Sequence, residues 1–98
     1  MHLVIYDDRI PVATGRVFCD KDGFHIGRIC VLKEYRSKQL GKLVMEKLIE
    51  KAISEGAKDI HLSSQLYATT FYRKFGFMEY GETYDDAGIE HISMILRV

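Results

Sequence analysis

Residues 30–56 read CVLKEYRSKQLGKLVMEKLIEKAISEG, and this stretch carries the strongest structural signal in the chain. It begins as the end of a β-type run and passes through a basic turn, Arg36–Lys42. From Leu40 to Glu55 apolar residues then recur at helical spacing, at positions 40, 44, 48 and 52 and at 45, 49 and 53. Gly56 is placed to cap the end of this helix. The stretch therefore predicts a strand, a turn and a long helix.

The sequence on either side predicts shorter elements around this unit. Before it lie the β-type runs His2–Tyr6, Ile10–Cys19 and Phe24–Leu32, with the turn signals Asp7-Asp8-Arg9 and Asp20-Lys21-Asp22-Gly23 between them. After it we expect a strand over Asp59–Ser64, a helix over Tyr67–Phe75, and strands over Phe77–Tyr84 and His91–Val98. The order β-β-β-α-β-α-β-β predicts one α/β domain over residues 1–98, a mixed sheet flanked by two helices.

The composition limits the classes of function. The chain has 98 residues, of which 47% are hydrophobic and 29% charged, as in an ordinary globular domain. Its 14 basic residues balance 14 acidic ones, so we expect neither a nucleic acid nor a membrane surface as partner. Cys19 and Cys30 lack metal-ligand spacing, which favours reduced, buried thiols and a cytoplasmic location and predicts no metal site. The start MHLVIYDD does not have the pattern of a signal peptide.

The basic turn carries the first chemical signal. It consists of Arg36, Ser37, Lys38, Gln39, Leu40, Gly41 and Lys42, and it leads directly into the long predicted helix. Free backbone N–H groups and the helix dipole make such a position an anion site. A solvated basic turn of no functional importance is the alternative that the turn alone leaves open. The P-loop pattern GxxxxGK[ST] does not fit, because Arg36 stands at its first glycine and Leu43 at its Ser/Thr.

These residues resemble the GNAT acetyltransferase motif R/Q-x-x-G-x-G/A, which follows a strand and precedes an amphipathic helix. The resemblance implies that backbone amides of Ser37–Lys42 hold the pyrophosphate of acetyl-CoA. It also implies that the main chain of Cys30, Val31 and Leu32 binds the pantetheine arm. One position departs from the motif, because Gln39 replaces the first glycine while Gly41 keeps the second. A side chain at Gln39 is expected to crowd the pyrophosphate, since glycine permits the closest approach of a backbone to a ligand.

A second block, QLYATTFYRKFGF over residues 65–77, resembles the family segment A-x-x-F-Y-x-K-x-G-F. The resemblance adds Gln65, Ala68, Phe71 and Tyr72 to the acetyl-CoA site. In many members the tyrosine that matches Tyr72 protonates the leaving thiolate, and a phenol with its usual pKa of about 10 can donate at neutral pH. The alternative for Tyr72 is an amphipathic core residue whose hydroxyl reaches solvent.

The ending AGIEHISM, residues 87–94, resembles the tail of small bacterial ElaA-like members of the family. The resemblance suggests that His91 faces the acceptor pocket. His25 and His61 also lie on predicted strands, so the catalytic base stays open among the three.

The resemblance covers roughly residues 10–98 and implies an acetyl-CoA-dependent N-acetyltransferase in which a primary amine attacks the thioester directly. It also indicates that the family's usual first strand and two following helices are missing, and this absence predicts a homodimer that covers the exposed sheet. A catalytically silent acyl-CoA-binding module is the alternative function, and an inert interaction fragment is a third.

Overall fold

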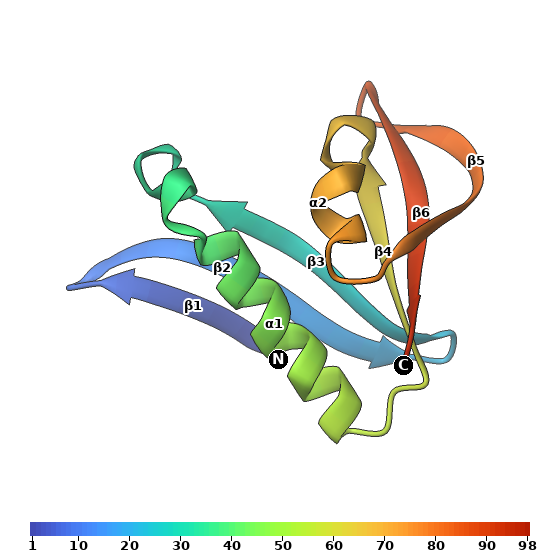
Figure 1. The fold of residues 1–98 in the computed structure, drawn as a ribbon, viewed down its shortest axis with the longest axis horizontal. Helices are drawn as coiled ribbons and strands as arrows, with labels where there is room; N and C mark the ends of the chain where they lie inside the picture. The colour runs from blue at the N-terminus through green and yellow to red at the C-terminus, as the bar shows by residue number, and fades with distance from the viewer.

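The computed structural model describes residues 1–98 and contains one mixed sheet of six strands in the order β1-β2-β3-β4-β6-β5 (Figure 1). The elements are β1 (His2–Asp7), β2 (Ile10–Asp20), β3 (Gly23–Val31), the 3-10 helix η1 (Lys33–Lys38), α1 (Leu40–Ser54), β4 (Asp59–Gln65), the 3-10 helix η2 (Leu66–Ala68), α2 (Thr69–Arg73), β5 (Met78–Asp86) and β6 (Ile89–Arg97). The predicted order of strands and α-helices is confirmed.

Tight turns build the first three strands into an antiparallel meander. Asp8 has φ 55° between β1 and β2, and Gly23 has φ 119° at the start of β3. The Asp20 carboxylate accepts a hydrogen bond from the Asp22 amide at 2.8 Å, which closes the second turn. Asp and Gly are residues that tolerate these conformations, so the local sequence is sufficient to place both turns.

The β3 and β4 strands run parallel but stay together only briefly. Their paired positions are Phe24 with Ile60 and His25 with His61, after which the strands separate. Helix α1 makes the crossover between them, as parallel neighbours require. Figure 1 shows the two strands diverging toward the end that carries α2. The divergence opens the sheet on the side where the motif residues lie.

The hydrophobic core lies on one face of the sheet. Val44, Met45, Leu48 and Ala52 of α1 are fully buried against Ile60, Met94 and their neighbours on the strands. The aromatic residues of α2 pack on the same core, together with the fully enclosed Phe77. Both helices therefore cover the same face, and the opposite face carries exposed side chains such as Phe18 and Tyr80.

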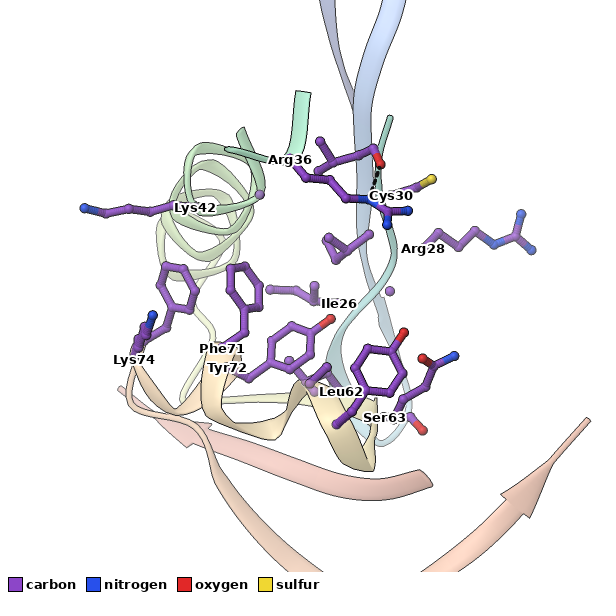
Figure 2. A pocket seen from close by; sticks show the side chains of 18 of the residues that line it. Ile26, Arg28, Cys30, Arg36, Lys42, Leu62, Ser63, Phe71, Tyr72 and Lys74 are labelled. Atoms are coloured by element: carbon purple, nitrogen blue, oxygen red, sulfur yellow. Dashed lines mark hydrogen bonds between the residues drawn. The ribbon is translucent and has the colours of Figure 1, made fainter. Parts of the chain in front are cut away.

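The structure corrects three expectations. The predicted helix Tyr67–Phe75 is a 3-10 turn followed by the five-residue α2, because Gln65 and Ala68 hold non-α backbone angles at its start. The turn before α1 contains the 3-10 helix Lys33–Lys38, which extends the connection from β3. The two thiols are exposed, since Cys19 adjoins the β2–β3 turn and Cys30 points away from α1 (Figure 2). None of the helices is long and apolar enough to cross a membrane.

Candidate functional site

An open cavity of about 1120 Å³ lies where β3 and β4 diverge, between the N-terminal part of α1 and α2. Its walls come from both halves of the chain, with Ile26–Val31 of β3 on one side and Leu62, Ser63 and Gln65 of β4 on the other. Most of the acetyl-CoA residues inferred from the sequence line this cavity, namely Cys30, Val31, Arg36, Gln39, Gly41, Lys42, Gln65, Ala68, Phe71 and Tyr72. Two motifs separated by more than twenty residues in the sequence thus meet at one place.

Four residues of the inferred set do not line the cavity: Leu32, Ser37, Lys38 and Leu40. Leu32 lies beyond the end of β3, and Ser37 and Lys38 are exposed on the 3-10 helix. The Lys38 ammonium lies 5.3 Å from the centre of the Tyr35 ring, outside the cavity. Leu40 packs against the hydrophobic core instead. Their binding roles stay predictions.

One end of the cavity is built to attract an anion. Helix α1 begins there, and the first N–H groups of a 15-residue helix have no intrahelical partner. The whole lining carries the cations Arg28, Arg36, Lys42 and Lys74 against the single carboxylate of Glu46. The Arg36 Nε donates to the Val31 carbonyl at 3.2 Å, which ties the turn to the end of β3 (Figure 2). Phosphate oxygens are the natural ligands for such a set.

The two glycine positions of the motif differ in conformation. Gln39 has φ 57° and ψ 29°, a left-handed conformation that favours glycine. Gly41 lies in the first turn of α1 and does not have a positive φ, but a Cβ there would lie 3.3 Å from the Phe71 ring. The missing side chain at Gly41 therefore lets α1 and α2 approach closely beside the cavity.

Tyr72 projects from α2 into the middle of the cavity, with its hydroxyl directed toward β3 (Figure 2). The ring is half-buried and contacts Phe71 and Phe77 edge-on, with centroids 5.1 and 6.4 Å away. Burial raises the pKa of the Tyr72 hydroxyl above its ordinary value, and the nearby Tyr67 acts in the same direction. Tyr72 thus holds its proton at neutral pH and can donate it.

The three histidines that the sequence offers as catalytic bases differ in their position relative to the cavity. His91 lines the cavity, whereas His25 and His61 do not. His25 lies 3.2 Å from an Asp20 oxygen, and His61 Nδ1 lies 3.3 Å from the Tyr80 hydroxyl. Both belong to an aromatic row on the sheet face that carries no helix. Of the three, only His91 is therefore within reach of a ligand in this cavity, and its role as a base stays a prediction.

Sequence reasoning did not find several lining residues, including Arg28, Ser63, Tyr67 and Lys74. Arg28 has φ 56° at an irregular position in the β2–β3 ladder, and no local pattern announces it. Ser63 could have been found, because strand alternation puts it on the same side as His61 and Gln65. Lys74 lies inside the quoted second block and matches its lysine.

Comparisons with known proteins match the chain to one family over almost its whole length. The model of the acetyltransferase (GNAT) domain matches residues 1–98. The uncharacterized N-acetyltransferase YjcF of Bacillus subtilis is 41% identical over 96 residues, which cover 96% of this chain and 68% of that protein. Protein ElaA of Escherichia coli is 30% identical over 101 residues, covering 99% of this chain and 66% of ElaA. The chain thus spans about two thirds of the length of these relatives.

Solved structures show the same fold. The crystal structure of Escherichia coli ElaA matches with a TM-score of 0.88 and 27% identity over 98% of this chain and 67% of that chain. An acyl-CoA N-acyltransferase from Pseudomonas aeruginosa matches with a TM-score of 0.88 and 26% identity over 97% and 66%. The expected α/β fold and the resemblance to ElaA-like members are confirmed. With a family model that spans all the described residues, the chain belongs to the GNAT acetyltransferase family, whose members are acyltransferases that use acetyl-CoA as co-substrate.

Proposed function

We propose that this chain transfers an acetyl group from acetyl-CoA to a primary amine by direct attack of the amine on the thioester. The observation that carries the proposal is the single cavity that joins the start of α1, the Tyr72 hydroxyl and the His91 ring. An anion end, a proton donor and a proton acceptor are the three features that this reaction requires of the protein. All three face the same open space.

The anion end supports binding of the acetyl-CoA pyrophosphate. Free N–H groups at the start of α1 can donate to phosphate oxygens, and Arg36 and Lys42 supply positive charge. The main chain of Cys30 and Val31 lies at the β3 wall, where an extended pantetheine arm can pair with it. The cavity passes between the two diverging strands, which gives the arm a path from the anion end toward Tyr72.

The proton chemistry is assigned to two side chains. As the C–N bond forms and the C–S bond breaks, Tyr72 supplies a proton to the leaving thiolate sulfur. His91 receives the proton that the amine nitrogen loses. Both side chains then regain their starting states by exchange with solvent, so no further reactant is needed.

One observation favours a second candidate, an acyl-CoA-binding module without turnover. Gln39 occupies the motif position of a glycine, and its side chain is exposed next to the anion end. A displaced pyrophosphate would move the thioester away from Tyr72, and a displacement of about 1 Å can cost a hundredfold in rate. Binding would survive such a displacement better than catalysis.

The deciding experiment combines a calorimetric titration with acetyl-CoA and a thiol-release assay against a panel of primary amines. We expect binding, and amine-dependent thiol release above the rate without amine. Binding with no release across the panel would support the silent module. The absence of any heat or thermal stabilisation at millimolar acetyl-CoA would contradict both candidates.

We further propose that the chain works in the cytoplasm as a homodimer and without nucleic acid. The balance of 14 basic and 14 acidic residues supports the absence of a nucleic-acid partner. Free Cys19 and Cys30 are compatible with a reducing compartment. The exposed sheet face supports self-association, and the corresponding measurement is given in the Discussion.

A further inference from the structure

Strand β5 pairs with β6 in two different registers. Met78, Glu79 and Tyr80 pair with Ile95, Met94 and Ser93, whereas Tyr84, Asp85 and Asp86 pair with His91, Glu90 and Ile89. If the first register continued, Glu82 would face His91. The chain around Gly81, which has φ 74°, inserts two extra residues, so that Tyr84 takes this place. The irregularity therefore puts a phenol beside His91 where a regular ladder would put a carboxylate.

Tyr84 is held at both of its ends. Its ring stacks against the His91 ring with centroids 6.0 Å apart and an interplanar angle of 26°. Its hydroxyl shares a hydrogen bond with the Ser63 hydroxyl on β4, the strand on the other side of β6. The Tyr84 side chain thus lies across β6, and Ser63 and His91 both line the cavity.

The His91 ring has a defined orientation. Its Nδ1 lies 2.9 Å from the Ile89 carbonyl oxygen, which can only accept a hydrogen bond. Nδ1 therefore carries the proton in the neutral ring, and Nε2 carries the lone pair. No other group of the chain forms a hydrogen bond with His91, so this lone pair is available to a ligand.

The neighbours of His91 in the strand ladder are neutral or directed elsewhere. Its cross-strand partner on β4 is Gln65, and Tyr67 of η2 lines the same cavity. The nearest acids in the ladder, Asp85 and Glu90, pair with each other one position along. Alternation along the strand directs them to the opposite face from His91.

We propose that Tyr84, fixed by Ser63, is a positioning residue that clamps the His91 ring against the Ile89 carbonyl and leaves Nε2 free for the acceptor amine. The role of Nε2 as proton acceptor rests on the function proposed above, whereas the clamp itself does not. Ser63 and Tyr84 act through His91, and neither needs to exchange a proton with the substrate. The clamp thus fixes the orientation of the His91 ring on the side of the cavity away from α1.

The first test determines the tautomer of the His91 ring by NMR and requires no amine substrate. Long-range ¹H–¹⁵N spectra of the imidazole rings, with the His91 signals assigned by loss in His91→Gln, report which nitrogen carries the proton. We expect protonated Nδ1 and bare Nε2 in the neutral His91 ring of the wild-type chain. Tyr84→Leu should give averaged shifts from both tautomers, and Tyr84→Phe, which keeps the ring, should retain most of the preference.

Tyr80→Leu is the matched control. Tyr80 lies on the same strand and face, but its hydroxyl meets His61, and it does not line the cavity. This variant should alter the His61 signals and leave those of His91 unchanged. The proposal is overturned if Tyr84→Leu keeps the wild-type His91 tautomer, or if Tyr80→Leu changes it equally.

The second test is kinetic and uses the primary amine found active in the thiol-release assay. Tyr84→Leu should lower kcat at least about tenfold, because general-base catalysis contributes roughly a hundredfold or more when the base is oriented. The KM for acetyl-CoA should stay at the wild-type value, and Tyr84→Phe should recover most of kcat. An unchanged kcat in Tyr84→Leu overturns the clamp, whereas failure of acetyl-CoA to bind the wild type removes the proposed function and leaves the NMR result intact.

Discussion

At the N-terminus of α1, Gln39 holds backbone angles that are costly for a residue with a side chain. Replacement by glycine removes a penalty of about 1–2 kcal/mol in the folded state, partly offset by the greater freedom of glycine in the unfolded chain. We therefore expect Gln39→Gly to gain up to about 1 kcal/mol in the free energy of unfolding in urea. The same change should tighten acetyl-CoA binding in calorimetry, because the turn can then approach the pyrophosphate.

Ala87→Gly is the control for Gln39. Ala87 has φ 54° in the β5–β6 turn and does not line the cavity. It should show a similar gain in stability with no change in acetyl-CoA affinity. Equal or weaker affinity in Gln39→Gly would contradict crowding by the glutamine side chain.

Tyr72 gives a second prediction for a single residue. Tyr72→Phe keeps the ring that packs against Phe71 and Phe77 and removes only the hydroxyl. We expect kcat to fall by about a hundredfold while the Kd of acetyl-CoA changes less than about twofold. Because burial raises the pKa of Tyr72, its hydroxyl should lose the proton only above pH 10.0, and wild-type kcat should fall there. The pH profile of the variant should not show this fall. An unchanged kcat would make Tyr72 a structural residue.

The contact between elements at Gly15 of β2 sets the position of α1. A Cβ on Gly15 would lie 2.6 Å from Val44 Cγ1 and 2.9 Å from Leu48 Cδ1, both on the buried face of α1. Gly15→Ala should therefore destabilise the fold by about 1–3 kcal/mol through overpacking. Gly27→Ala on β3 is the matched control, since a Cβ there meets nothing within 4 Å. Urea unfolding that gave equal losses for both would contradict this account of the packing.

An ion pair joins the short helix α2 to β5. Five residues are too few for a stable isolated helix, and the Arg73 guanidinium forms a forked pair with the Glu79 carboxylate. The hydrogen bond from Arg73 holds the pKa of Glu79 below its usual 4.5. A lowered folded-state pKa stabilises the fold above the unfolded value, and this contribution disappears as the pH falls through the folded value.

The pH dependence of Tm provides the measurement for this pair. Between about pH 7 and pH 3 the wild-type Tm should fall more steeply than that of Glu79→Gln, which has no carboxylate to protonate at this position. Glu82→Gln, on the same strand and without an ion pair, should follow the wild type. Parallel curves for the wild type and Glu79→Gln would show that the pair contributes nothing to stability.

On the scale of the whole molecule, the sheet face without helices is the surface that predicts self-association. Tyr6 is 60% exposed on the edge strand β1, and Val4 and Ile10 are also exposed. A second copy can cover this face through a two-fold axis. Light scattering at micromolar concentration should give twice the monomer mass. Tyr6→Glu should lower the measured mass to that of one monomer, whereas Leu43→Lys on the outer face of α1 should leave it at that of a dimer. A strictly monomeric wild type would rule out the dimer.

Local spacing was sufficient for the order of the strands and α-helices and for the long helix α1, but not for the extent of α2. The alternation of apolar residues and the Asp and Gly turns determined the hairpins, because these depend on neighbours a few residues apart. The helical period placed Val44, Leu48 and Ala52 in the core correctly, although it included Ile53, which is 49% exposed near the end of α1. The family blocks around Gly41 and Tyr72 predicted which segments line the cavity.

Which side chains share the cavity, and how they are oriented, follows from packing between distant segments and could not be predicted from the sequence alone. Each of the histidines at 25, 61 and 91 lies on a predicted strand, and only the resemblance of the tail favoured His91. The structure shows that His91 alone of the three lines the cavity that forms where β3 and β4 diverge. The two-residue insertion at Gly81 replaces Glu82 by Tyr84 beside His91. The physical reason is that strand divergence and register result from packing between distant segments, whereas spacing along the chain encodes only the local geometry of each element.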